Sequence, residues 1–175
     1  MGRRLSALEL TVLGVVLKRG PCLAHAVVRE FSGSQTNAYR SGAGSIYPLL
    51  KRLTSAGLLK VARKKYTLTE AGQEALREWL RPPFPDGDFS TSLDVLRSRA
   101  YFLKLLGPSE IVEFVDYARE GLEKLLVSCR ATHAQYVELG DPYSEMAMLG
   151  AIKETEARLA WLDELRARFG DVAPV

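Results

Sequence analysis

The sequence predicts a mainly α-helical protein built from two domains, and three observations support this prediction. Apolar residues recur at helical spacing through most of the 175 residues. The stretch at 81–88 contains three prolines, one glycine and two aspartates, which cannot sustain a helix or a central strand. Residues 1–81 carry fourteen Lys and Arg against five Asp and Glu, a net of +9, whereas residues 82–175 carry ten against sixteen, a net of −6. We therefore expect a basic domain at 1–81, a linker at 82–89 and an acidic domain at 90–175.

The first helix is expected to begin at a capping box. Ser6 can accept a hydrogen bond from the amide of Glu9, and the Glu9 carboxylate can reach back to the amide of Ser6. The helix stops before Gly20-Pro21, because proline cannot continue it. Its apolar residues fall on one face: Leu8, Val12, Leu13, Val16 and Leu17.

Five further elements are expected in the basic domain, in the order helix, helix, strand, strand, helix. Their ranges are Cys22–Phe31, Ser45–Ala56, Leu58–Ala62, Tyr66–Leu68 and Thr69–Trp79. The helix that starts at Ser45 ends where Gly57 can take the C′ position. Three helices, two strands and a closing helix within about eighty residues make the order of a winged helix-turn-helix with a small two-stranded wing.

The acidic domain is expected to be helical throughout, with helices at Ser92–Leu106, Ser109–Glu138 and Pro142–Phe169. Two apolar pairs in the last helix lie seven residues apart: Ile152 with Leu159, and Leu162 with Phe169. Such near-heptad spacing, flanked by charged residues, is typical of a coiled coil. We therefore expect these four residues to hold two chains together in a homodimer.

The helix that starts near Ser45 supplies the first candidate DNA-binding residues. Its apolar residues occupy one face, and the other face carries a hydroxyl, a phenol, a proline and two cations: Ser45, Tyr47, Pro48, Lys51 and Arg52. In a helix-turn-helix, the N-terminal residues of the recognition helix meet base edges and phosphates. The alternative is a solvated basic face that binds nothing. The basic wing that follows at the expected place favours the DNA interface.

The wing turn supplies the second group of candidates: Arg63, Lys64 and Lys65. Three neighbouring cations repel one another and add no stability to a single chain. Against DNA the same cluster releases counterions and adds affinity without much sequence preference. The alternative is that these cations only protect an edge strand. We expect them to contact phosphates or the minor groove, and Arg3 and Arg4 could reach a phosphate too.

The segment from Ser45 to Leu53, together with Gly57-Leu58-Leu59 and the run from Lys65 to Gly72, resembles the signature of the PadR family of bacterial transcription factors. The resemblance is specific over about residues 5–80. It extends more weakly to the acidic helices, which look like those of the larger subgroup with a helical dimerisation domain. It implies a homodimeric regulator, usually a repressor, that a small molecule such as a phenolic acid or a drug releases from DNA. The wing is shorter than the basic, glycine-rich wing common in the family, which argues against deep insertion into the minor groove.

Catalysis, metal binding and membrane insertion are not expected. The sequence has no nucleophile elbow, phosphate loop, zinc-protease motif or dinucleotide-binding glycine pattern. Its two cysteines and two histidines are too scattered for a metal site, and no cofactor is implied. No segment approaches the roughly 20 apolar residues of a transmembrane helix, and no signal peptide is evident. We therefore expect a cytoplasmic protein.

Six aromatic residues could line an effector cavity between the domains, although core and dimer packing is the favoured interpretation: Trp79, Phe84, Phe102, Phe114, Tyr117 and Trp161. We expect a ligand-responsive, homodimeric repressor that reads a pseudo-palindromic operator in double-stranded DNA. The alternative is a winged-helix protein-interaction module that never touches DNA. The charge of +9 on the first domain argues against this alternative, because such a module has no need of it.

Overall fold

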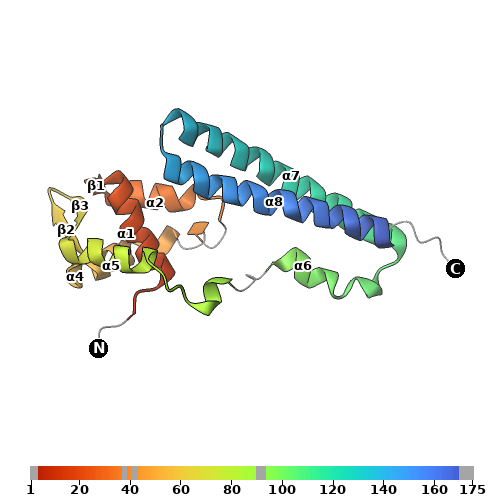
Figure 1. The fold of residues 1–175 in the computed structure, drawn as a ribbon, viewed down its shortest axis with the longest axis horizontal. Coiled ribbons are helices and arrows are strands. Elements are labelled where there is room, and N and C mark those ends of the chain that lie inside the picture. Colours follow the sequence, from red (N-terminus) through yellow and green to blue (C-terminus); the bar gives the residue numbers. More distant parts are fainter. Residues whose placement is uncertain (1–3, 37–38, 41–42, 90–93, 170–175) are drawn as a thin grey trace. The chain divides into compact units, whose positions relative to one another are not determined.

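The computed structural model describes residues 4–36, 39–40, 43–89 and 94–169. Two compact units make up the chain, residues 1–90 and 91–175. Helices dominate both units, and the first also holds a small antiparallel sheet (Figure 1). The predicted fold class, a mainly α-helical protein with a winged helix-turn-helix followed by long helices, is confirmed.

The first unit has the element order of a winged helix-turn-helix. Its elements are α1 (Ala7–Arg19), β1 (Cys22–Leu23), α2 (Ala24–Ser32), η1 (Ala43–Ser45), α4 (Ile46–Ser55), β2 (Leu59–Ala62), β3 (Lys65–Leu68), α5 (Glu70–Leu80) and η2 (Asp86–Phe89). The expected capping box opens α1: the Ser6 hydroxyl accepts from the Glu9 amide at 3.3 Å, and the Ser6 amide donates to the Glu9 carboxylate at 2.9 Å. Gly57 takes the left-handed conformation expected after α4, with φ of 73°.

The sheet of the first unit has three strands, whereas the sequence predicted two. β1 pairs antiparallel with β3, with Cys22 opposite Tyr66, and β3 pairs on its other side with β2. Cys22 and Leu23 were expected to open the second helix, which instead begins at Ala24. An extended segment after Pro21 can pair with β3, and a two-residue strand leaves no periodicity for the sequence to reveal.

The core of the first unit joins α1, α2 and α4 to the sheet and to α5. Its most buried side chains are Val12, Leu13, Val16, Val27, Phe31, Ile46, Leu50 and Leu53. Three of these lie on the apolar face of α4 that the sequence predicted. Because that face is fixed in the core, the opposite face of α4 is directed to solvent.

The second unit is an antiparallel helical hairpin preceded by shorter elements (Figure 1). Its elements are α6 (Val95–Ala100), η3 (Leu103–Leu105), α7 (Pro108–Glu138) and α8 (Pro142–Phe169). The helix predicted at 92–106 is wrong in its extent, because the chain leaves the α-conformation after Ala100. The 3₁₀ turn that follows buries Leu103 in the core with Ile111 and Val115 of α7. No helix within the described ranges is long and apolar enough to cross a membrane.

The apolar stripe of α8 packs mainly within its own chain, which corrects an expectation from the sequence. Ile152 and Leu162 were expected to face a second chain, but both are buried in clusters shared with α7. Leu159 packs beside both clusters, and Phe169 remains exposed. Helices of one hairpin and helices of two chains need the same heptad spacing, so the pattern alone could not separate these two arrangements.

Candidate nucleic-acid interface

All five residues that the sequence singled out in this helix are exposed, including Arg52, whose side chain is 54% exposed. Ser45, Tyr47, Pro48 and Lys51 are all exposed, while the apolar side of the helix lies in the core. The Tyr47 side chain is large, partly apolar and 55% exposed, which the packing of the first unit does not require. Tyr47 and Lys51 lie four residues apart, so they are neighbours on the same side of the helix.

Arg52 differs from the other four candidates because its guanidinium already has a partner. Its Nε donates to Oε1 of Glu9 at 3.1 Å, and its Nη2 lies 3.1 Å from the same oxygen. Glu9 is a buried residue of α1. The structure therefore places Arg52 in an ion pair with the body of the unit, a contact that the sequence did not reveal.

The wing turn holds its cations in an unusual backbone conformation. Ala62 pairs with Lys65, so Arg63 and Lys64 alone form the turn between β2 and β3. Both have positive φ, 49° and 63°, which is the geometry of a type I′ turn. Asn-Gly is the favoured sequence for this turn, and a side chain with a β-carbon in the left-handed region costs roughly 1–2 kcal/mol per residue. The tip therefore carries two long cations at some cost in stability.

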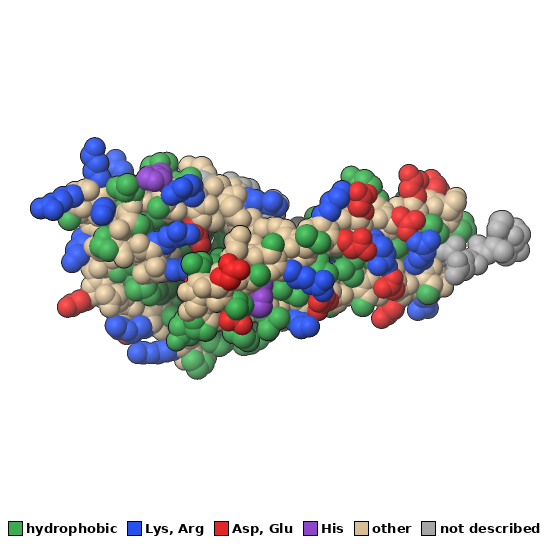
Figure 2. Space-filling model, turned by 90° about the horizontal axis from the view of Figure 1, so that it is seen from above, with side chains coloured by type: hydrophobic (Ala, Val, Ile, Leu, Met, Phe, Trp, Pro, Cys, Tyr) green, Lys and Arg blue, Asp and Glu red, His purple; other side chains and the backbone are tan. Residues whose placement is uncertain are grey.

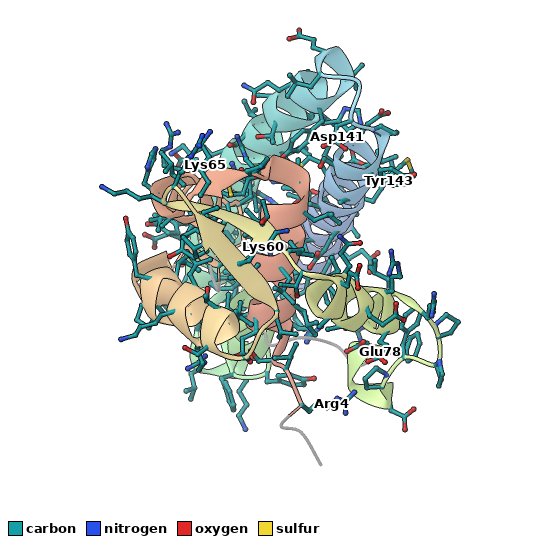
Figure 3. All side chains as sticks on the ribbon, turned by 90° about the vertical axis from the view of Figure 1, so that its left-hand side faces the viewer. Arg4, Lys60, Lys65, Glu78, Asp141 and Tyr143 are labelled. Atoms are coloured by element: carbon teal, nitrogen blue, oxygen red, sulfur yellow. The ribbon has the colours of Figure 1, made fainter. Side chains whose placement is uncertain are left out.

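Basic side chains gather over the first unit, whereas acidic and basic side chains alternate along the helices of the second (Figure 2). Figure 3 looks onto the sheet and shows Lys60 and Lys65 on the strands of the wing. Lys60 is exposed on β2 and was missed in the sequence. Its position on an exposed strand next to a basic turn could have identified it as a further candidate for DNA binding. We use "wing cations" for Arg63, Lys64 and Lys65.

Among the described residues, the wing cations lack carboxylate partners. In the part of the chain that the structure describes, no Asp or Glu lies within ion-pair distance of them, of Lys51 or of Lys60. Other cations of the same unit are paired, since Arg19 bonds to Glu30. The unpaired cations therefore leave a field of positive charge that is directed outward.

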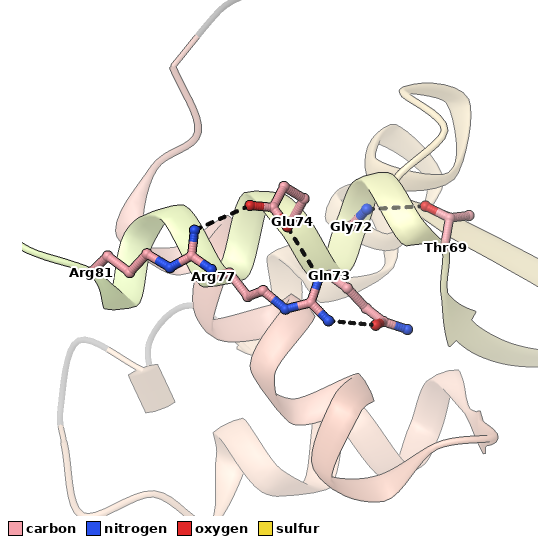
Figure 4. A network of polar contacts seen from close by, with 6 residues as sticks. All are labelled: Thr69, Gly72, Gln73, Glu74, Arg77 and Arg81. Carbon is pink, nitrogen blue, oxygen red and sulfur yellow. Dashed lines mark hydrogen bonds and ion pairs between the residues drawn. The ribbon is translucent and has the colours of Figure 1, made fainter.

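Two contacts fix the base of the wing to α5. Thr69 is the N-cap of this helix, and Gly72 packs closely against the backbone of Leu58. The Thr69 hydroxyl accepts from the Gly72 amide at 3.0 Å (Figure 4). The same hydroxyl donates to the carbonyl of Gly57 at 2.7 Å. A β-carbon at Gly72 would lie 2.1 Å from the carbonyl oxygen of Leu58, so only glycine fits there. Farther along α5, Glu74 bonds to Arg77 and Arg81 (Figure 4). These contacts account for the Thr69–Gly72 part of the signature.

A hollow lies in each of the two units. The first lies among α1, α4 and α5, has a volume of about 920 Å³, and is lined by Glu9, Arg52, Leu53, Leu58 and Trp79 among others. The second lies along α7, has a volume of about 490 Å³, and is lined by Leu96, Leu106, Phe114, Tyr117 and Leu122 among others. The six aromatic residues are thus distributed: Trp79 lines the first hollow, Phe114 and Tyr117 line the second, Trp161 packs against the core, and Phe84 and Phe102 are exposed.

Neither the two cysteines nor the potential metal ligands form a reactive site among the described residues. Burial raises the pKa of the Cys22 and Cys129 thiols, which keeps both protonated and weakly nucleophilic. Among the described residues, no three His, Cys, Asp or Glu side chains gather in a way that could hold a metal ion.

Comparison with known proteins supports the resemblance seen in the sequence. Residues 12–78 match the transcriptional regulator PadR-like family. The negative transcriptional regulator PadR of Bacillus subtilis (strain 168) is 22% identical over 179 residues, covering 91% of this chain and 96% of that protein. These matches confirm the predicted resemblance.

Solved structures share the fold. Bacillus subtilis PadR in complex with p-coumaric acid has a TM-score of 0.77 at 22% identity, covering 94% of this chain and 96% of the other. The same regulator in complex with operator DNA has a TM-score of 0.71 at 21% identity, covering 94% and 99%. The Vibrio cholerae virulence activator AphA has a TM-score of 0.63 at 19% identity, covering 95% and 100%.

Proposed function

We propose that this chain, whose residues 12–78 form a PadR-like domain, is a homodimeric repressor that binds double-stranded DNA and is released by a small aromatic effector. The observation that carries DNA binding is the wing tip, where Arg63 and Lys64 hold two cations in left-handed conformations. Self-repulsion and backbone strain both work against this arrangement in an isolated chain. A polyanionic partner removes the repulsion, and its binding energy can outweigh the strain. The relative crystallised with operator DNA supports the same interpretation.

The two parts of the interface would contribute differently to binding. A helix of ten residues fits the major groove, where Tyr47 and Lys51 can donate hydrogen bonds to base edges and Ser45 to a phosphate. The wing cations would lie along phosphates and release counterions. A two-residue turn is too short to enter the minor groove deeply. Sequence choice would therefore come from α4, and much of the salt-dependent affinity from the wing.

The dimer contact needs a surface other than the buried side of α8. The outer face of α7 is the better candidate, because Tyr117 is 81% exposed beside the hollow of the second unit and Val127 is exposed farther along the same helix. Apolar patches of this kind mark protein interfaces. We propose that a second copy of the chain covers them. Phe169 is the exposed one of the four residues that the sequence assigned to the dimer contact, and it can contribute to this contact at the end of α8.

The effector is proposed to be a small planar aromatic molecule, as in the relative bound to p-coumaric acid. The hollow beside Trp79 can hold a molecule of this size and lies against α4. Binding there should quench Trp79 and weaken DNA binding in the same titration, because coupling between two ligands is reciprocal. We propose no enzymatic role, and we place the protein in the cytoplasm with the DNA that it would regulate.

Selection from a random duplex library tests DNA binding directly. The intact protein should enrich a pseudo-palindrome whose half-sites are about 10–10.5 base pairs, or a multiple, apart. Fluorescence anisotropy should then show that affinity falls with salt, with a log–log slope of about −0.9 for each phosphate contact. An intact protein without salt-dependent binding to any duplex would overturn the proposal. A winged-helix protein-interaction module would then be the better interpretation.

A further inference from the structure

We propose that Arg52 is a positioning residue, which orients the recognition helix by binding the buried carboxylate of Glu9 and does not contact DNA. This role rests on the proposed DNA-binding function and deepens it. It would make Glu9, a buried residue of α1, part of the machinery that reads DNA.

The Glu9 carboxylate serves two elements at once. It is 1% exposed, and its Oε2 accepts from the Ser6 amide at 2.9 Å and from the Ser6 hydroxyl at 3.1 Å. Its other oxygen, Oε1, accepts from Arg52 Nε at 3.1 Å and lies 3.1 Å from Arg52 Nη2. A buried carboxylate is stable only when it is paired and hydrogen-bonded. One oxygen therefore closes the N-terminus of α1, and the other fastens α4 to it.

Helix geometry separates Arg52 from the residues proposed to read DNA. Successive residues are turned by about 100° around a helix, so Arg52 lies on a different flank from Lys51 although it follows it in sequence. Tyr47 and Lys51 are four residues apart and share one flank. Arg52 is on the opposite flank, where it meets α1. The buried apolar face of α4 lies between these two flanks.

The ion pair supplies what the apolar face of α4 lacks, which is a directional contact. The hydrophobic effect depends on buried area and not on direction, so it specifies the rotation of α4 about its axis less sharply than an oriented polar contact does. Hydrogen bonds from a guanidinium fork weaken when their angles change. Recognition groups must be held within about 10–20° of their working geometry. The Arg52–Glu9 contact therefore sets the rotation of α4 and, through it, the direction of Tyr47 and Lys51.

Four variants of the intact protein test this role. Glu9→Gln keeps an oxygen for the capping box, which accepts either residue at this position, but removes the charge that holds Arg52. Arg52→Met keeps the aliphatic stem and removes the guanidinium. Arg52→Lys keeps the charge without the planar fork. Ser6→Ala is the matched control, because it removes a hydroxyl from the same carboxylate and leaves the link to Arg52 in place.

Binding to the selected operator and to a random duplex should be measured by anisotropy at a temperature where circular dichroism shows every variant folded. Glu9→Gln and Arg52→Met should each lower operator affinity about tenfold and leave the random-duplex affinity and the salt slope unchanged. The double variant should be no worse than either single one, because both remove one contact. Compared with Arg52→Met, Arg52→Lys should regain much of the lost melting temperature. Its preference for the operator over random DNA should recover less. Ser6→Ala should lower the melting temperature and keep the operator preference.

Other outcomes would overturn the assignment in distinct ways. If Arg52 binds a phosphate, Arg52→Met will weaken both duplexes alike and reduce the salt slope by about 0.9 per contact, whereas Glu9→Gln will not. If the pair only stabilises the fold, melting temperatures will fall while the operator preference of every variant stays intact. If Arg52→Met does not fold, Glu9→Gln and Arg52→Lys carry the same test. If the intact protein binds no duplex, the proposed function fails, and this role fails with it.

Discussion

The cations that join the two long helices of the second unit differ from the cations of the candidate DNA interface in the first unit. In the second unit, arginines of the hairpin pair with carboxylates on the other helix: Arg119 with Asp163, Arg166 with Asp116, and Arg130 with Glu156. In the first unit, Lys51 and the wing cations have no such partner among the described residues. The same residue types therefore link the two helices of the hairpin in the second unit, and at the wing and on α4 they leave charge for a binding partner.

Backbone conformation shows the same contrast. Within the described residues, the only non-glycine residues with positive φ are Arg63 and Lys64, at the tip of the wing. The long helices of the second unit have regular backbone and a continuous apolar seam. Strain is thus concentrated where the proposed partner binds, which is typical of functional sites. The second unit is built for internal stability, and the first gives up some stability for an interface.

The largest expected effect concerns the seam of the second unit. Leu162→Ala should lower the free energy of unfolding by about 2–5 kcal/mol, because it leaves a cavity between α7 and α8. Urea denaturation followed by circular dichroism measures this change. Met146→Ala, at an exposed site of the same helix, is the control and should change stability by about 0.5 kcal/mol or less.

Protein concentration separates the two interpretations of this seam. A residue buried within one chain destabilises the chain at every concentration, whereas a residue between two chains has an effect that depends on assembly. Similar losses for Leu162→Ala and Phe169→Ala, both decreasing as protein concentration rises, would restore the original interpretation of the stripe as a contact between chains.

The next largest effect concerns the wing. Replacing Lys64 and Lys65 together by Ala should weaken operator and random duplex alike, because phosphate contacts carry no sequence information. The log–log salt slope should fall by about 0.9 per lost contact, and a dimer loses up to four. Lys51→Ala is the contrast, since it should cost roughly 1–3 kcal/mol on the operator and much less on random DNA. An unchanged slope for the wing variant would show that these lysines point to solvent.

Sequence reasoning recovered the periodic parts of this molecule and lost the parts that depend on pairing in space. The capping box at Ser6, the apolar face of α4 and the C′ position of Gly57 all follow from local chemistry, and the structure contains them. The strand at 22–23 depends on β3, more than forty residues later, so no local signal could reveal it. For the same reason the sequence placed Ile152 and Leu162 at the wrong contact.

The candidate site divides in the same way. Exposure of Tyr47 and Lys51 could be predicted from helical spacing alone. The partner of Arg52 could not, because Glu9 lies 43 residues earlier and its capping role already explained its presence. The cations of the wing could be read from composition, but the left-handed turn at Arg63 and Lys64 depends on a register that places Ala62 opposite Lys65.

A smaller effect tests the strain at the wing tip. Arg63→Asn combined with Lys64→Gly should raise the free energy of unfolding by about 1–2 kcal/mol, since Asn-Gly suits a type I′ turn. DNA affinity should fall at the same time, because two cations per chain are lost. The variant with Ala at both positions loses the same charges without relieving the strain, so it should weaken DNA binding and not gain stability. Equal free energies of unfolding for the two variants would show that the left-handed conformation of Arg63 and Lys64 does not destabilise the chain.

The smallest effect concerns the paired charges of the second unit. Hydrogen bonds from Lys153 and Arg130 hold the pKa of the partly exposed Glu156 carboxylate below its usual value. Arg130→Gln should raise this pKa toward the ordinary range, although Lys153 keeps part of the shift. Because the folded-state pKa is the lower one, the pair stabilises the fold above the ordinary pKa of glutamate, about 4.3, and loses this contribution as the pH falls through the folded-state value.

Titration of the Glu156 side chain by NMR measures the shift, and operator binding at neutral pH provides the comparison with the wing. Arg130→Gln removes a cation, as the wing variants do, yet it should leave the affinity and the salt slope unchanged, because Arg130 already pairs with a carboxylate of its own chain. A fall in affinity comparable to that of a wing variant would mean that DNA responds to the total charge of the chain. DNA binding would then not depend on the cations of the first unit in particular. The difference between paired and unpaired cations would not explain the affinity for DNA.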